Sequence, residues 1–511
     1  MKRQTLIKST LILGVAGIFA RFLGLFFRIP MQMLLGDEGM GYYQMSYPLY
    51  LTFIAVSSGI PIAVSKIISE MNAKNDGNGI FRVIRSTFLI MVPTALAFSF
   101  VLIFFSDNII TSLRWDRKSY YALIATSLAP VFVITMGILR GFFQGLHNMN
   151  PTAISQVIEQ IGRVVGGVGL AYMLFPLGIE YAAGGAALGA LIGSLLGFIY
   201  LVIKFLSVLR YIPKKKSDIK RPIVGDILRN AIPFSFGAVV GTIMGLVDSI
   251  VVPRGLLRAG FSSKDAAILY GQLTGKAATL SHVPLALSVA LCTSIVPIVA
   301  EAYVKNRKVE LQNKVEGVIK LSSVISMPSA MGLYFLSYPV MSLVFRGDFG
   351  GYTILKYMAI SLPFIVLSQC STTLLQAMNN FYAPVKNLAI GCILKIILTY
   401  ILVPIPNINI YGAVIGSTIG YITSSILNMI LIKRKLLMPI NMLDSIIKPI
   451  IASLIMSISV ILGYKYMYTH TLSNDLACLS AIVIGVITYL LAVIILKIFS
   501  YKEVKGKFNV S

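Results

Sequence analysis

Basic side chains stand inside long apolar runs at several places in this 511-residue sequence. Arg21 interrupts GIFARFLGLFF, Arg163 interrupts IEQIGRVVGGVGLAYM, and Lys395 interrupts LAIGCILKIILTYIL. An ionised group near the centre of a bilayer costs about 2.5–3.5 kcal/mol on insertion scales, so it needs a partner or a wet cavity. Arginine also matches the geometry of phosphate oxygens with its planar fork of donors. These residues therefore predict a deep cationic cavity for an anion, with phosphate as the favoured group.

Other polar residues accompany these cations in the apolar runs. Glu159 lies four residues before Arg163, on the same face of a helix, and this pair is either structural or part of the site. The candidate substrate-binding residues are Arg21, Arg28, Glu159, Arg163, Lys276 and Lys395. The candidates for gating or coupling are Lys66, Arg140, Asp248 and His282. The alternative for Arg28, Lys66 and Arg140 is that each extends to an interface, and for His282 that it is a hydrogen-bonded core residue.

The composition identifies the elements that must position these residues. The chain is 57% hydrophobic and 12% charged, with a mean hydropathy of +0.83, which indicates an integral membrane protein. The apolar blocks have the length of about 20 residues that a membrane-spanning helix needs, and no short alternating pattern suggests a barrel. We predict an all-α protein with fourteen spans, near residues 10–32, 44–68, 83–106, 120–142, 152–174, 181–206, 224–249, 272–300, 317–345, 352–378, 386–404, 411–433, 444–468 and 475–499.

The distribution of lysine and arginine predicts the orientation of the spans. Clusters such as KKKSDIKR (214–221) and KRK (433–435) fall on one side of the predicted membrane, so both termini should be cytoplasmic and the protein should lie in the cytoplasmic membrane. The net charge of +25 is then a topology signal and an attraction to anionic membrane lipids, and no nucleic acid is expected as a partner. The four cysteines show no paired spacing, so we expect neither a disulfide nor a metal site.

The chain also repeats itself at an interval of 227 to 233 residues. QGLHNMNP (144–151) returns as QAMNNFYAP (376–384), and glycines 185, 189 and 193 return as glycines 412, 416 and 420. Each predicted half has six spans, an even number, so the two halves run in the same direction, as in many transporters. We predict an N-lobe at 1–210 (spans 1–6), a C-lobe at 211–435 (spans 7–12), and spans 13 and 14 with a cytoplasmic tail at 436–511.

Several stretches resemble the stage V sporulation protein B family. They include KSTLILGVAGIFARFLGLFFRIPMQMLLGDEGMGYYQMSYP, GIPIAVSKIISE and RGFFQGLHNMNPTAISQVIEQIGRV. This family belongs to the polysaccharide-transporter branch of the multidrug/oligosaccharidyl-lipid/polysaccharide (MOP) exporter superfamily and is related to MurJ-type lipid II flippases. In such relatives an R-x-L-G-x-x-R motif lines the central cavity. Arg21 matches its first arginine and Arg28 comes one residue late, while YPLYLTF (47–53) lacks the basic residue of the relatives' second span.

The resemblance implies a MOP flippase fold and a flippase function. The expected cargo is an undecaprenyl-pyrophosphate-linked peptidoglycan precursor (lipid II), moved by alternating access for spore cortex or cell wall synthesis. Another lipid-linked polysaccharide repeat unit is the alternative, and a multidrug (MATE-type) drug or cation antiporter is the third. An enzyme is not expected, because the longest outer loop offers only Asp265 as an acid. No cofactor is expected, and a coupling ion and the cell-wall synthesis machinery stay open as partners.

Overall fold

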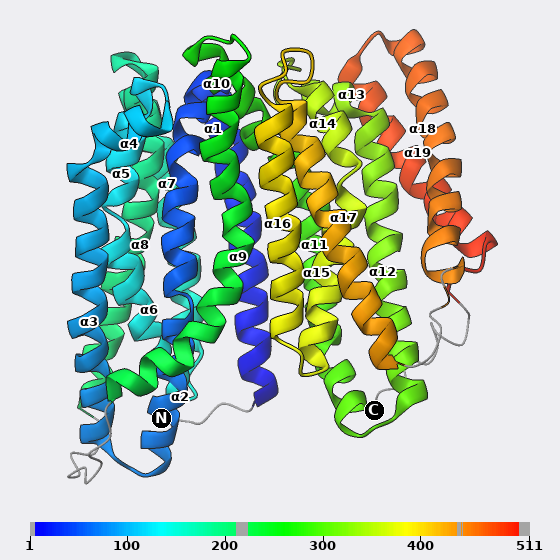
Figure 1. The fold of residues 1–511 in the computed structure, drawn as a ribbon. Helices are drawn as coiled ribbons and strands as arrows, with labels where there is room; N and C mark the ends of the chain where they lie inside the picture. Colours follow the sequence, from blue (N-terminus) through cyan, green and yellow to red (C-terminus); the bar gives the residue numbers. More distant parts are fainter. Residues whose placement is uncertain (1–5, 211–222, 437–440, 442, 500–511) are drawn as a thin grey trace. The chain divides into compact units, whose positions relative to one another are not determined.

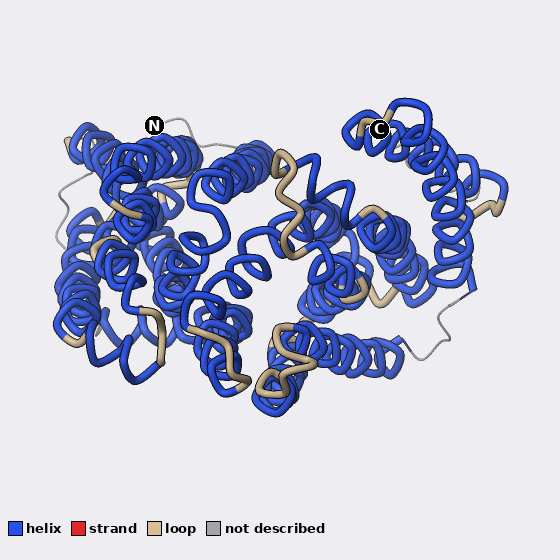
Figure 2. The backbone as a smooth tube through the Cα atoms, turned by 90° about the horizontal axis from the view of Figure 1, so that it is seen from above, coloured by secondary structure: helices blue, strands red, loops and turns tan. Residues whose placement is uncertain are grey.

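The computed structural model describes residues 6–210, 223–436, 441 and 443–499. Within these ranges the description leaves out the side chains of residues 6–15, 18, 21, 22, 25, 26, 233, 289–295 and 297. The chain folds into two compact units, residues 1–271 and residues 272–511. Figure 2 shows that the described elements are helices joined by short loops. This agrees with the predicted all-α class.

The first unit contains ten α-helices and two short 3-10 helices among the described residues (Figure 1). One part of its core packs α2, α3, α6 and α9 together around Ile68, Val83 and Phe142. The elements are α1 (Leu6–Ser57), α2 (Gly59–Ala73), α3 (Gly77–Phe104), α4 (Ser106–Leu113), η1 (Arg117–Ser119), α5 (Tyr120–Ser127), α6 (Pro130–Gly145), α7 (Asn150–Leu174), η2 (Phe175–Leu177), α8 (Ile179–Leu209), α9 (Ile223–Arg258) and α10 (Ser263–Gly271).

Helix α1 changes direction at Gly36, where the first and second predicted spans were expected to be separate. Gly36 has φ +62° and ψ −171°, a conformation that glycine adopts without the steric cost that a Cβ brings. Directly after this break, α1 crosses α10 at very short range. A Cβ on Gly41 would lie 2.0 Å from the carbonyl oxygen of Ala267, and one on Gly271 would lie 2.0 Å from that of Asp37. The break and the crossing therefore both depend on glycine.

The second unit contains nine α-helices and two short π-helices among the described residues. Its interior includes a polar cluster in which Asn428 accepts from Asn387 at 2.8 Å and donates to Ser371 at 3.1 Å. The elements are η3 (Gln272–Ala277), α11 (Ala278–Val304), α12 (Lys308–Phe335), α13 (Ser337–Val344), α14 (Tyr352–Ala359), α15 (Leu362–Ala377), α16 (Tyr382–Leu402), α17 (Tyr411–Leu436), η4 (Leu443–Ile447), α18 (Lys448–Thr471) and α19 (Asn474–Ile495).

The backbone of the two units repeats in the way that the sequence motifs predict. His147 and Asn379, both at φ +58°, end α6 and α15, and their amides bond to the carbonyls of Gln144 and Gln376. Two further pairs of residues with positive φ recur at nearly the same interval, namely Asn75 with Asn306 and Arg114 with Arg346. A left-handed residue ends a helix only where the local turn requires it. Three such turns at one interval therefore indicate that the halves share one chain path.

Over the residues that the structure describes, eleven helices are long and apolar enough to cross a membrane, or twelve if the bent pair α14–α15 is one span. This bent pair has an angle of 47° and coincides with the predicted span at 352–378. The predicted spans at 10–32 and 272–300 run through residues whose side chains are not described, so this count does not test them. The number fourteen therefore stays a prediction.

Helix α9 is attached to the first unit near both of its ends. The indole Nε1 of Trp115 donates to the carbonyl oxygen of Ser249 at 2.7 Å, and Nε of Arg254 donates to that of Leu113 at 3.1 Å. At the opposite end, the amide of Gly59 donates to Ser235 Oγ at 3.1 Å. Residues 223–271 thus pack with the first unit, whereas the sequence repeat assigns them to the second half. The lobe boundary between residues 210 and 211 stays a prediction from the repeat.

Candidate functional site

Three described charged residues of the predicted spans gather between α6 and α7. Nη2 of Arg140 lies 2.9 Å from Glu159 Oε2, and Nη2 of Arg163 lies 3.5 Å from Glu159 Oε1. Arg140 also donates from Nε to Ser155 Oγ at 2.9 Å. The three charged side chains are only 12–15% exposed. One carboxylate thus lies between two guanidinium groups, and this cluster keeps a net positive charge.

Tyrosines of α1 hold the other side of Arg163. Its Nη2 donates to the Tyr50 hydroxyl at 3.1 Å, and its Nη1 lies 3.5 Å from the Tyr47 hydroxyl. Tyr47 in turn stacks on Tyr43, with ring centroids 5.2 Å apart. Nε of Arg163 is buried without a hydrogen-bond partner. Because a buried donor without a partner is costly, this N–H group is available to an anion that enters the cluster.

The glycines of α8 explain why Arg163 and Glu159 lie so close to that helix. A Cβ on Gly193 would lie 2.3 Å from the carbonyl oxygen of Glu159, and one on Gly189 would lie 2.7 Å from that of Arg163. Small residues at such spacing let membrane helices approach closely. The backbone of α7 therefore rests on α8, and the side chains of Glu159 and Arg163 are directed to α6 and α1.

The same packing recurs around Lys395 in the second unit. A Cβ on Gly416 would lie 3.1 Å from the carbonyl oxygen of Lys395, and one on Gly420 would lie 2.7 Å from that of Gly391. Lys395 thus occupies the position in α16 that Arg163 occupies in α7, and it is 2% exposed. The position of Glu159 is taken by Gly391. The two units therefore place a buried cation at equivalent sites and an acid at only one of them.

Arg21 and Arg28 both belong to α1, but only the side chain of Arg28 is among the described ones. Arg21 is part of α1, but its side chain lies outside the described residues, so its predicted role stays a prediction. Arg28 is partly buried and interacts electrostatically with the hydroxyl of Tyr43, as Arg163 also does. Phe27 packs edge-on against the same tyrosine at 6.2 Å. Arg28 thus belongs to the surroundings of the Arg140–Glu159–Arg163 cluster.

Four other predicted site residues have partners outside this cluster. Lys276 is 1% exposed, and its Nζ lies 2.7 Å from Asp348 Oδ2 within the second unit. Lys66 is exposed and donates to Asn230 Oδ1 at 2.8 Å. Asp248 of α9 is partly buried and interacts electrostatically with Tyr270. His282 is exposed and takes part in polar or electrostatic contacts. The structure therefore brings Arg140, Glu159 and Arg163 together. Lys66 and Asp248 have other partners within the first unit, and Lys276 and His282 belong to the second unit.

Sequence reasoning missed several partners. It placed Arg140 near an interface and did not connect it with Glu159, 19 residues away on the next helix. The predicted site assigns no role to Tyr47 or Tyr50, although their spacing of three residues puts both on one face of α1. One expectation is wrong, because Cys370 is disulfide-bonded. Spacing in the sequence could not indicate this bond, because its formation depends on how helices pack.

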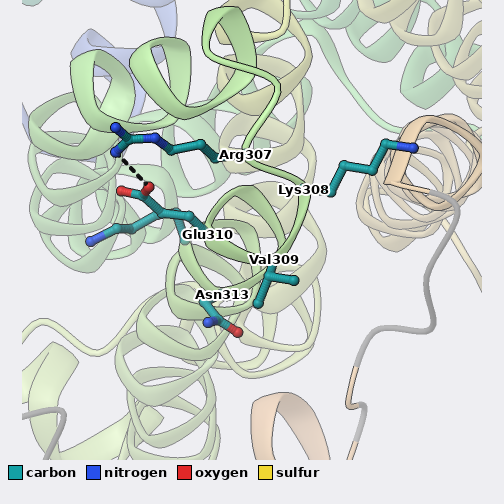
Figure 3. Close-up of a pocket in the computed structure, with 6 residues that line it drawn as sticks. Arg307, Lys308, Val309, Glu310 and Asn313 are labelled. Atoms are coloured by element: carbon teal, nitrogen blue, oxygen red, sulfur yellow. Dashed lines mark hydrogen bonds and ion pairs between the residues drawn. The ribbon is translucent and has the colours of Figure 1, made fainter.

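A second charged feature lies at the turn between α11 and α12. A shallow pocket of about 580 Å³ lies there. Figure 3 shows Arg307 paired with Glu310 in this pocket, a contact of 3.2 Å. The pocket is lined by Arg307, Lys308, Val309, Glu310, Asn313 and Lys314. These basic residues belong to a connection that the sequence assigns to the cytoplasmic side. Within the described part of the chain, no three His, Cys, Asp or Glu side chains gather as metal ligands.

Solved structures identify the class of protein that this fold defines. "Lipid II flippase MurJ, inward closed conformation" superposes with a TM-score of 0.72 at 21% identity, over 95% of this chain and 99% of that one. An inward-facing multidrug resistance MATE family transporter of the MOP superfamily gives a TM-score of 0.67 at 14% identity, over 81% and 94%. The chain is therefore an all-helical, multi-pass membrane protein with the fold of the MOP superfamily.

Comparison of sequences gives the family. Residues 6–303, more than half of the chain, match the polysaccharide biosynthesis protein family, and residues 274–401 match the MatE family. The chain belongs to the polysaccharide biosynthesis protein family, whose members are transporters and flippases and not enzymes.

The relatives of this chain include two proteins of Bacillus subtilis (strain 168) with named roles. Stage V sporulation protein B is 29% identical over 84% of this chain and 83% of its own length. Lipid II flippase MurJ is 24% identical over 91% and 90%. The resemblance to the stage V sporulation protein B family is thereby confirmed.

Proposed function

We propose that this protein is a flippase for a lipid-linked glycan precursor, and that its cargo is lipid II, the undecaprenyl-pyrophosphate-linked peptidoglycan precursor. The observation that carries the proposal is the net positive cluster of Arg140, Glu159 and Arg163 inside membrane-spanning helices. A pyrophosphate is the anion that such donors fit. Membership of the polysaccharide biosynthesis family and similarity to a lipid II flippase support this choice.

The proposed mechanism is alternating access between two halves of like chain path. Arg21 and Arg163 in the first half and Lys395 in the second are the candidate contacts for the pyrophosphate. In this proposal the chain crosses the membrane fourteen times, and both termini lie in the cytoplasm. An inside-negative membrane potential favours outward movement of an anion by about 2.3 kcal/mol per charge per 100 mV. The potential alone can therefore drive a large part of the outward step.

A flippase for another lipid-linked polysaccharide repeat unit has the same physical requirements at the pyrophosphate. The two substrates differ in the sugars, and no described residue discriminates between them. A drug or cation antiporter is the third candidate, because residues 274–401 match the MatE family. It would be favoured by a cavity dominated by carboxylates, whereas the cluster found here contains one carboxylate and two guanidinium groups.

The test is a translocation assay in cells from which redundant lipid II flippases have been removed. Depletion of this protein should lower the accessibility of lipid II at the outer face, while another undecaprenyl-pyrophosphate glycan stays accessible. Lys395→Gln should reproduce the loss, and Lys386→Gln, an exposed lysine on the same helix, should not. Unchanged lipid II accessibility on depletion would refute the proposed cargo.

A further inference from the structure

An apolar groove lies in the first unit, beside the half of α9 that begins at Ile223. It has a volume of about 320 Å³, near the lower end of the ~300–1,000 Å³ that ligand pockets span. Figure 1 shows this half of α9 inclined towards α2 and α3. Lining residues come from α1, α2, α3, α6 and α9 and include Phe53, Val56, Met91, Ile134, Ile232 and Phe236. The groove is separate from the Arg140–Glu159–Arg163 cluster.

The mouth of the groove is lined by exposed apolar side chains. Val56 is 54% exposed, Ile232 is 60% exposed and Phe236 is 59% exposed. Exposed apolar side chains of a membrane-spanning unit suit contact with lipid hydrocarbon. A groove with such a mouth has the chemistry to take up a hydrocarbon chain.

The groove is held open by direct contacts between α9 and α2. The amide of Gly59 donates to Ser235 Oγ, and a Cβ on Gly59 would lie 2.1 Å from the carbonyl oxygen of Ala231. The backbone of α2 at Gly59 thus already contacts Ser235 and Ala231 of α9, so α2 and α9 cannot move closer together and close the groove. The contacts between α2 and α9 therefore keep the groove open.

Cations stand at one end of the groove. Lys66 lies six residues beyond the lining residue Ile60, about 9 Å along α2 at 1.5 Å per residue, and its Nζ bonds to Asn230 of α9. Arg229 of α9 is exposed and is the neighbour of the lining residue Leu228. Asp226 lies one turn earlier on α9 and Glu70 one turn beyond Lys66 on α2, so the two cations stand beside two acids. In the orientation proposed above, these cations lie at the level of the inner-leaflet headgroups.

We infer that this groove binds the carrier lipid of the cargo, with its phosphate at Lys66 and Arg229 and its first hydrocarbon segment between α1, α3 and α9. This inference rests on the proposed function. A polyprenyl phosphate has one chain, which suits a single narrow groove, whereas a phospholipid has two. The site receives the lipid at the inner face, before the pyrophosphate reaches the buried cations. Loading of the cargo and its translocation thus use different residues.

The test is photolabelling of the purified full-length protein in nanodiscs with a diazirine analogue of undecaprenyl phosphate. The label should map to residues 53–66 and 223–239. Val56→Trp, which fills the mouth of the groove, should remove this labelling, and Val101→Trp, at an exposed valine of α3 outside the groove, should retain it. Lys66→Gln combined with Arg229→Gln should weaken binding roughly tenfold or more, because charge-assisted hydrogen bonds are lost. The control Lys204→Gln, at an exposed lysine of α8, should leave binding unchanged.

Two results would overturn the inference. Labelling that is insensitive to Val56→Trp would place the lipid elsewhere. Equal displacement of the label by phosphatidylglycerol and by undecaprenyl phosphate would make the groove a general lipid site. The assay measures binding and not transport, so it separates this inference from the proposed function. If the translocation assay shows no dependence of lipid II on this protein while specific labelling persists, the inferred lipid-binding groove is retained and lipid II is not the cargo.

Discussion

Replacement of Glu159 by glutamine tests the reasoning behind the buried cluster most directly. Its carboxylate lies 2.9 Å from Arg140 and 3.5 Å from Arg163. Two unit charges 4 Å apart interact by about 4 kcal/mol at an effective dielectric constant of 20, so Glu159 offsets both cations strongly. Removal of one partner from a buried ion pair typically costs about 3–5 kcal/mol. We expect the lower end for Glu159→Gln, because the side chains keep some exposure.

The matched variants predict a definite order of stability. Arg140→Gln leaves Glu159 paired with Arg163 and should cost less, about 1–2 kcal/mol. The double variant Arg140→Gln/Glu159→Gln leaves one cation bonded to tyrosines, so it should be more stable than Glu159→Gln alone. Thermal unfolding of the purified proteins in detergent, together with their levels in the membrane, measures this order. A Glu159→Gln variant as stable as the wild type would refute the pairing, and so would a double variant less stable than Glu159→Gln.

Three further outcomes can be measured. Gly193→Ala should destabilise the protein by about 1–3 kcal/mol, because its Cβ would lie 2.3 Å from the backbone of α7, whereas Gly169→Ala, with open space around it, should be neutral in the same melting assay. Asp348→Asn should cost about 2 kcal/mol through loss of its charged contact with Lys276, and a double variant with Lys276→Met should recover part of the melting temperature. Arg21→Ala should abolish lipid II translocation at normal protein levels, while Arg21→Lys should restore it in part; full transport by Arg21→Ala would end its assignment as a substrate ligand.

The repeat and the helical class could be predicted because both are properties of local sequence. Glycines four residues apart make one face of a helix small, and that face must pack closely to bury itself. Gly193 and Gly420 do so against equivalent positions of α7 and α16. The turn at His147 likewise reappears at Asn379, because both follow the same Gln-containing helix end. The ends of helices and the faces by which they pack can therefore be predicted from the local sequence.

The partners of the buried charges could not be predicted in the same way. Glu159 and Arg163 are four residues apart, so their proximity follows from helix geometry alone. The closer contact of Glu159 is with Arg140 on α6, and it depends on the rotation and depth of two helices. The attachment of α9 to the first unit has the same origin, since its partners Trp115 and Gly59 are far away in the sequence. The periodicity of the sequence predicts which face of a helix packs, but not which residues of another helix it contacts.

Because Trp115 donates a hydrogen bond to Ser249, its intrinsic fluorescence can report on the position of α9. The sequence contains one tryptophan, and its indole is buried and bonded to the backbone of α9. The fluorescence of the chain excited at the indole band therefore arises from a single site. A displacement of this end of α9 would expose the ring to water and shift its emission to longer wavelength, without any attached dye. The wild-type protein can thus report, in real time, whether α9 stays in place while a lipid is carried across the membrane.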